Sequence, residues 1–293
     1  MRITEGIKYS SIQINIQRTA NNFYKANEQV ATGKKLINSS DDPSAMREVL
    51  DMRSLEASAD QYLDNMTKAN NSLELASTTI DRVDELVTQA WEYAVLGGEP
   101  DQRAAAAIGI TGIMDEMFSL ANTKDDGKYI FSGFSTSTQP FDPADPTYTY
   151  NGDTGSIQIA IDDSINVAVN VTGDSLFSGA GGGIDLFTEL DNLRTALQTD
   201  DETAIQSALT TFQTAHDQVE NAAALTAARY SQVGAKMEST ENFKNNLLSR
   251  ISAVEDVDSA KAVVNLTMMQ TAYEVALSSS TMLMETNLMN FLA

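Results

Sequence analysis

The chain has 293 residues, no cysteine, one histidine and a formal net charge of −22 at pH 7. Without cysteine it has neither disulfides nor thiolate metal ligands, and its length allows one large domain or two ordinary ones. The acidic excess argues against a nucleic-acid partner, which requires clustered Lys and Arg.

The net charge comes from the middle of the chain. Residues 1–60 have eight basic and eight acidic side chains and residues 261–293 have a net charge of −1, so residues 61–260 carry −21. The N-terminal segment lacks the apolar core and cleavage site of a secretion signal, and no apolar run approaches 18 residues, so neither a cleaved signal nor a membrane span is expected. Chain ends are normally polar and frayed. We expect these neutral, apolar ends to be covered by protein.

The first predicted helix has an apolar stripe at heptad spacing, which favours packing along another helix. The stripe consists of Ile12, Ile16, Thr19, Phe23, Ala26 and Val30.

The polar stretch at residues 30–45, VATGKKLINSSDDPSA, then interrupts the helical pattern. Gly33 fits a helix end, Asp42 fits an N-cap, and Pro43 fits the first position of the next helix. A phosphate-binding loop would follow a strand. The stretch is therefore predicted to be a hinge between two helices.

The second helix is predicted to be much longer than an ordinary globular helix. Its apolar stripe has thirteen positions in strict 3/4 alternation, and Gly97-Gly98 ends the helix. The thirteen are Met52, Leu55, Ala59, Tyr62, Met66, Ala69, Leu73, Ala76, Ile80, Val83, Val87, Ala90 and Ala94. A helix of roughly 54 residues would be about 80 Å long. A shorter helix is predicted over residues 106–120.

The pattern changes to alternation between Tyr129 and Val171, with Asn151-Gly152 as a turn signal. This predicts a hairpin-rich β insertion of about 50 residues. A short helix at 186–197 and a long helix from Ile205 to about Ile251 are predicted to follow.

The last helix, which Asp258 or Ser259 can cap, has two adjacent apolar stripes. One is Val264, Met268, Thr271, Val275, Ser278, Met282, Glu285, Met289 and Leu292; the other is Val263, Leu266, Gln270, Tyr273, Leu277, Ser280, Met284, Leu288 and Phe291. Together they cover more of the helix than one core requires, so neighbours are expected on more than one side.

The sequence has no recognisable enzyme motif. His216 alone cannot form a His-based metal site, and no Gly-x-Ser-x-Gly elbow accompanies it. The glycines at 179–183 lack the Lys of a phosphate loop, and residues 124–127 lack the spacing of a calcium loop. We predict no catalytic activity, no cofactor and no metal site.

The stretch at residues 30–45 resembles the N-terminal signature of bacterial flagellins and their hook-associated relatives. Residues 80–89, 229–235 and 252–263 are similar to further ordered motifs of that family, although Asp84 replaces a basic residue common in filament flagellins. Residues 127–141 and 148–155 resemble the group of hook-associated proteins found at the hook–filament junction.

The resemblance implies a mainly α fold: a long antiparallel helical rod, terminal helices paired as a coiled coil that lines an inner tube, and a small β-rich inserted domain. It implies three domains. These are a terminal coiled coil (1–43 and 252–293), a helical rod (44–127 and 184–251) and a β-rich outer domain (128–183).

The function implied by the resemblance is a structural adaptor that links hook-associated protein 1 to flagellin, touches neighbouring copies of itself and has no membrane or nucleic-acid partner. An export chaperone is expected on the C-terminal helix, with type III export to the extracellular flagellum without a cleaved signal. The terminal helices are expected to fold on docking. The predicted assembly interface consists of Ile12, Ile16, Phe23, Val30, Val264, Met268, Val275, Met282, Met289 and Leu292, with a hinge at Gly33, Asp42 and Pro43.

Replacing Met282 and Leu292 with Asp is then expected to block incorporation. Two alternatives stay open: the filament flagellin itself, and a secreted binding or hydrolytic protein with its site on the β insertion. For the second, deleting about residues 128–183 would abolish activity and leave assembly; the structural hypothesis expects little loss beyond local stability.

Overall fold

The computed structural model describes the backbone of residues 5–180 and 182–292, and the side chains of residue 7, residues 9–180 and residues 182–282. The chain forms two compact units. Unit 1 consists of Met1–Ser58 and Phe243–Ala293, and unit 2 consists of Ala59–Asn242. The division differs from the three domains predicted from sequence, which remain a prediction.

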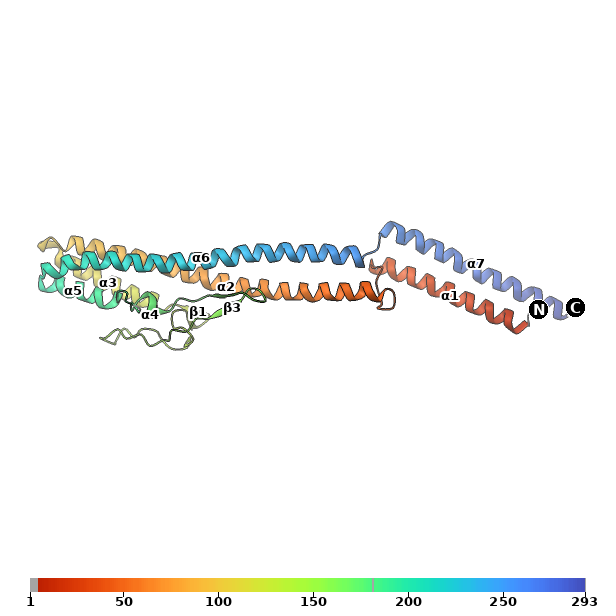
Figure 1. The fold of residues 1–293 in the computed structure, drawn as a ribbon, viewed down its shortest axis with the longest axis horizontal. Helices are drawn as coiled ribbons and strands as arrows, with labels where there is room; N and C mark the ends of the chain where they lie inside the picture. Colours follow the sequence, from red (N-terminus) through yellow and green to blue (C-terminus); the bar gives the residue numbers. More distant parts are fainter. Residues whose placement is uncertain (1–4, 181, 293) are drawn as a thin grey trace. The chain divides into compact units, whose positions relative to one another are not determined.

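Long helices dominate the described chain, as predicted. The helices are α1 (Glu5–Thr32), α2 (Pro43–Leu96), the 3₁₀ helix η1 (Pro100–Gln102), α3 (Arg103–Ala121), α4 (Gly173–Leu176), α5 (Leu186–Thr199), α6 (Glu202–Glu255) and α7 (Ser259–Leu292). Within unit 1, α1 and α7 run side by side and antiparallel; within unit 2, α2 and α6 do the same (Figure 1).

The predicted signals set the helix ends. The Asp42 side chain accepts hydrogen bonds from the backbone N–H groups of Ser44 and Ala45, both at 3.0 Å, and Pro43 is the first residue of α2. Asp258 likewise accepts from the N–H of Ala260 at 3.1 Å, at the start of α7. These side chains satisfy N–H groups that have no partner within a helix.

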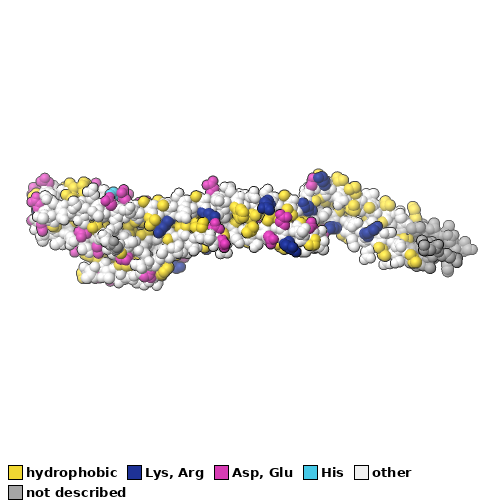
Figure 2. All heavy atoms as spheres, in the orientation of Figure 1, with side chains coloured by type: hydrophobic (Ala, Val, Ile, Leu, Met, Phe, Trp, Pro, Cys, Tyr) yellow, Lys and Arg dark blue, Asp and Glu magenta, His cyan; other side chains and the backbone are white. Residues whose placement is uncertain are grey.

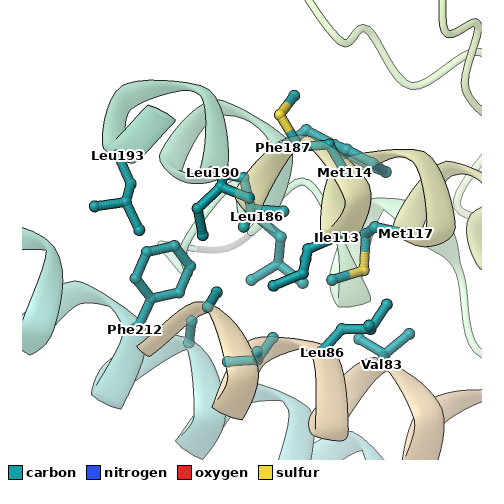
Figure 3. Packing of buried hydrophobic residues seen from close by; sticks show 14 of the residues in the cluster. Val83, Leu86, Ile113, Met114, Met117, Leu186, Phe187, Leu190, Leu193 and Phe212 are labelled. Carbon is teal, nitrogen blue, oxygen red and sulfur yellow. The ribbon is translucent and has the colours of Figure 1, made fainter. Parts of the chain in front are cut away.

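The predicted apolar stripe of α2 forms the core. Of its thirteen positions eleven are buried, Tyr62 is half-buried and Leu55 is exposed. In unit 2 the stripe packs against α3, α5 and α6, where Phe187 and Phe212 are fully buried (Figure 3). The Phe187 ring stacks on Phe118 with centroids 4.3 Å apart.

One segment, Pro100–Ala121, is long and apolar enough to cross a membrane by length and composition, with a mean hydropathy of 1.3 over 18 residues. It was not predicted as a span, because charged and polar residues interrupt its apolar runs. Ala106, Ile110 and Met117 on α3 are fully buried against the rest of unit 2. These residues place one face of α3 in the core of unit 2.

The insertion contains much less β structure than predicted. Among the described residues it has the strands β1 (Lys124–Asp125), β2 (Lys128–Tyr129), β3 (Gln158–Ala160) and β4 (Asn166–Ala168), paired as two small antiparallel hairpins. The alternation up to Val171 includes the β3–β4 hairpin, but the predicted turn at Asn151-Gly152 joins no pair of described strands. Between Tyr129 and Tyr150 the chain is irregular, because Pro140, Pro143 and Pro146 cannot donate ladder hydrogen bonds.

The insertion is part of the core of unit 2. Phe131, Phe141 and Phe177 are fully buried in the same cluster as α2, α3, α5 and α6. A second cluster joins the β3–β4 hairpin to the helices of unit 2. In it Ile161, Val167 and Val169 pack with Met66 and Leu73 of α2 and Val233 of α6. Removing residues 128–183 would therefore expose both clusters, contrary to the small effect expected from the sequence.

Candidate assembly interface

The predicted stripe of α1 faces α7 within the same chain. Ala26 is buried, and Ile12, Ile16, Phe23 and Val30 are half-buried. The Phe23 ring stacks on Tyr273 of α7 with centroids 6.0 Å apart and planes 7° apart. Heptad spacing predicted a helical partner, and the described structure supplies that partner from the other end of the chain.

Helix α7 turns a different set of residues toward α1. Apart from Asn265, its least exposed positions are Ala262, Leu266, Met269, Tyr273, Ala276 and Ser280. They recur every three or four residues and so share one face. Leu266, Tyr273 and Ser280 belong to the second stripe named from the sequence.

The first stripe of α7 lies on the opposite side of the helix. At 100° per residue, Val264 and Val275 lie about 160° and about 140° from the centre of the face that contacts α1. The exposed fractions are 59% for Val264, 56% for Met268, 58% for Val275 and 65% for Met282. We call these four residues the outer stripe; Figure 2 shows hydrophobic side chains at the surface over α7.

The predicted interface residues are thus of two kinds. Those of α1 contact α7, whereas the outer stripe is exposed in the single chain; the side chains of Met289 and Leu292 lie outside the described residues. A row of large exposed apolar side chains marks an interaction surface. The sequence predicted both faces of α7, but the heptad pattern did not indicate which one faces α1.

The connector after α1 is held in place by local bonds. Gly33 has φ +70°, a conformation that favours glycine, and its N–H donates to the Gln29 carbonyl at 3.0 Å. The Asp41 side chain accepts from Lys25 at 2.6 Å and from two backbone N–H groups. The bond from Lys25 and these N–H groups lower the pKa of Asp41 to about 2. That this bonded connector moves as a hinge remains a prediction.

The sequence analysis missed Glu255, which joins the connector to α2 and the end of α6. Its carboxylate accepts from Lys34 at 2.9 Å and from Arg53 at 2.7 Å, and its backbone carbonyl accepts from the Lys35 N–H at 2.7 Å. The Gly33 carbonyl accepts from Val257 N–H at 2.9 Å. An acidic residue at a helix C-terminus opposes the helix dipole, and this unfavourable placement was the available sequence signal.

Burial raises the pKa of the Glu255 carboxyl, but the hydrogen bonds from Lys34 and Arg53 outweigh burial and hold it below its ordinary value of about 4.5. A carboxyl with a depressed folded-state pKa stabilises the fold above the unfolded-state pKa. That contribution is lost as the pH falls through the folded-state value.

We expect Glu255→Gln to lower the free energy of local opening around residues 33–36 by about 1–2 kcal/mol at pH 7, since Lys34 and Arg53 are partly exposed. The difference from wild type should shrink below about pH 4.5. Amide hydrogen exchange of residues 33–36 in both proteins measures this free energy of opening at each pH. Glu48→Gln, which removes only an exposed pair with Arg250, is the control and should change little. A difference that grows on acidification would contradict the assigned role of Glu255.

The single histidine lies in unit 2, away from any recognisable catalytic set. Nδ1 of His216 is 2.7 Å from Oδ1 of Asp84, and Nε2 is 3.6 Å from Glu220. Among the residues for which the structure describes side chains, no group of three or more His, Cys, Asp or Glu could hold a metal ion.

The described structure has long antiparallel helices, paired chain ends and an exposed apolar stripe on α7. These features are those of a helical structural protein. Residues 3–136 match the model of the bacterial flagellin N-terminal helical region. The chain is 27% identical to flagellar hook-associated protein 3 of Escherichia coli K12, over 96% of each chain. It is 30% identical to flagellar hook-associated protein 3 of Salmonella typhimurium, over 68% of this chain and 67% of that protein.

Solved structures show the same fold. A flagellar hook-associated protein from Vibrio parahaemolyticus aligns over 74% of this chain and 100% of its own, with a TM-score of 0.68 and 17% identity. FlgL of Bacillus cereus aligns over 71% of this chain and 99% of its own, with a TM-score of 0.56 and 23% identity. The chain belongs to the flagellar hook-associated protein 3 family of the bacterial flagellins, whose members are structural proteins of the bacterial flagellum.

Proposed function

We propose that this protein is the structural adaptor at the hook–filament junction, linking hook-associated protein 1 on one side to flagellin on the other. The observation that carries the proposal is the outer stripe of α7, which presents Val264, Met268, Val275 and Met282 at an end of the chain with little net charge. Each such side chain contributes about 1.5–3 kcal/mol when a neighbour removes it from water.

In the proposed mechanism, docking orders the terminal helices. Ordering a backbone residue costs about 1–2 kcal/mol, so long helices become favourable only when an interface covers them. α1 and α7 then form the terminal coiled coil, with Ile12, Ile16, Phe23 and Val30 between them, and the outer stripe contacts the neighbouring subunits. Met289 and Leu292 would extend that stripe.

The three-part division (1–43 with 252–293, 44–127 with 184–251, and 128–183) is proposed for the assembled state, with the acidic residues of unit 2 facing solvent. Figure 2 shows Asp and Glu side chains gathered over the end of unit 2 that carries α3 and α5. Copies would pack through different surfaces of each subunit, as open stacks require.

We also propose how the chain is exported and kept from aggregating before it assembles. The chain would leave the cell without a cleaved signal and reach the extracellular flagellum by the type III pathway. An export chaperone would cover the outer stripe of α7, because an exposed apolar face of this kind promotes aggregation. The role needs neither catalysis nor a cofactor.

The test is electron microscopy of a strain that lacks this gene, together with an assay for flagellin in the medium. Bare hooks with shed flagellin are expected, because filament subunits would be made and have nothing to attach to. Bare hooks with no flagellin anywhere would identify the chain as the filament subunit instead. Normal filaments would contradict a junction role, and restoring the gene controls for effects on its neighbours.

A further inference from the structure

The two connectors of unit 1 pair with each other. Lys34, in the connector that follows α1, and Asp256, in the connector that precedes α7, form an isolated antiparallel bridge. Backbone hydrogen bonds of 2.7 Å and 2.9 Å flank this bridge on either side. We call residues 33–36 and 255–258 the joint, because they bring the two ends of the chain together at one place.

The joint is anchored to α2 and α6. Leu36 is 7% exposed and packs in a hydrophobic cluster with side chains of both helices. The Lys35 ammonium donates to the Ala253 carbonyl of α6 at 3.0 Å, and the Glu255 carboxylate accepts from Arg53 of α2 at 2.7 Å. None of these contacts involves α1 or α7, so the joint has its own source of stability.

The links between the joint and the terminal helices are short and hydrogen-bonded. Gly33 alone separates α1 from Lys34, and two residues separate Asp256 from α7. The Thr32 hydroxyl accepts from the Lys34 N–H at 3.3 Å. The Asp258 carboxylate accepts from N–H groups in the first turn of α7 at 3.1 Å and 3.2 Å. A helix that begins so close to a fixed point is restricted in its rotation about its own axis.

Both faces of α7 are apolar enough to pair with α1. Leu266 and Tyr273 lie on the face that meets α1, and Met268 and Val275 of the outer stripe are also seven residues apart, the spacing of a coiled-coil position. The pattern alone therefore does not choose between the faces. Ala262, in the first turn of α7, is 4% exposed. Because side chains three or four residues apart share one face of a helix, the direction in which Ala262 points determines which face is buried.

We propose that the joint, and not the apolar pattern of α7, decides which face of α7 meets α1. The joint directs Ala262 toward α1, and the face of Leu266 and Tyr273 follows along the helix. The outer stripe is thereby left exposed for a neighbouring subunit. The inference goes beyond the proposed function, because it concerns the single chain and does not depend on which protein the outer stripe contacts.

The test inserts one alanine between Lys261 and Ala262 in the full chain. One residue added to a helix turns all later residues by about 100° relative to the start of the helix. The added alanine takes the buried position of Ala262. Met268 and Val275 then take inward positions, so α7 can still turn apolar side chains toward α1. If the joint decides, α7 pairs through this new face; if the apolar pattern decides, α7 turns back to its original face.

Disulfide formation between introduced cysteines reports which face is inward, because the natural chain has no cysteine. Phe23→Cys is combined with Tyr273→Cys or with Ala272→Cys, since the Phe23 ring stacks on Tyr273. Each purified chain is oxidised, and closure is followed by its gel mobility. Without the insertion the 23–273 pair should close about tenfold faster than the 23–272 pair, because a disulfide needs Cβ atoms about 4 Å apart. With the insertion this order should reverse, since Ala272 takes the place of Tyr273.

The same insertion after Ser278 is the matched control. It turns only residues beyond Tyr273, so the 23–273 pair should remain the faster one. Lys35→Pro, in the chain without an insertion, removes a backbone N–H that closes the joint. This substitution should reduce the difference between the two rates, because α7 is then less restricted.

Faster closure of the 23–273 pair in the chain with alanine before Ala262 would overturn the inference, because the apolar pattern would then orient α7. Equal rates for the two pairs in the chain without an insertion would also overturn it. So would closure of neither pair, because the joint would then not bring α1 and α7 together. These measurements use the purified chain, so they are separate from incorporation into flagella, which tests the proposed function.

Discussion

A chain carrying Met268→Asp and Val275→Asp is expected to fold as the wild type does and to be absent from flagella. Both side chains are more than half exposed in the single chain, so the substitutions should change its unfolding free energy by no more than about 0.5 kcal/mol each. In an assembly that covers the outer stripe, each unpaired carboxylate would cost several kcal/mol. Two together should lower incorporation more than about 100-fold, as measured by immunoblotting of isolated flagella.

The control for this prediction adds the same two charges elsewhere on α7. Thr267 and Thr281 are exposed polar residues on the flank of the helix, and Thr267→Asp with Thr281→Asp should have a much smaller effect on incorporation. Circular dichroism and gel filtration of the secreted chains establish that each variant is folded. Wild-type incorporation of the outer-stripe variant would show that this stripe is not an assembly interface.

Deleting residues 128–183 is expected to unfold unit 2, which is a much larger effect than the loss of a separate outer domain. The deletion removes Phe131, Phe141 and Phe177, each fully buried against the helices. Replacing one buried Phe with Ala costs about 3–5 kcal/mol, and a whole domain is stable by only about 5–15 kcal/mol. Trp91, the only tryptophan in the sequence, lies in unit 2. Its fluorescence, followed during denaturation of the deletion variant, should therefore show no cooperative unfolding transition.

Two single substitutions in the insertion provide the matched control. Phe131→Ala should cost about 3–5 kcal/mol, whereas Phe134→Ala, three residues further on and largely exposed, should leave the Trp91 transition within about 1 kcal/mol of wild type. If the deletion kept a cooperative Trp91 transition at the wild-type midpoint, the helices of unit 2 would fold without the insertion. The deletion would then be a clean test of any activity located there.

The helices of this protein were predictable because their signals are local. Asp42, Pro43 and Asp258 act within one turn of the helix starts that they specify. The apolar stripe of α2 repeats along one continuous segment, and a repeat of that length has no other common explanation than burial along a helix. The family motifs lie on the same segments, so the sequence also indicated the family.

The insertion was predicted less well because its apolar residues have two possible uses. Alternating apolar residues such as Phe131 and Val169 are typical of strands, but here many of them pack on α2, α3, α5 and α6 instead of forming a sheet. Short strands with prolines between them depend on those distant contacts. The hydrogen bond from the Phe134 N–H to the Asp153 carboxylate likewise joins residues 19 apart, and no local pattern specifies that contact.

The sequence by itself determined the helical class, the starts of α2 and α7, the neutral ends and the two apolar faces of α7, because periodicity and capping are properties of neighbouring residues. It did not indicate the short helix α4. Only the tertiary structure decided that the Leu266–Tyr273 face meets α1 and leaves Val264, Met268 and Val275 exposed, and that Glu255 holds the connector through Lys34 and Arg53. Both outcomes depend on which segments lie side by side. Residues more than 200 positions apart come into contact only when the whole chain folds.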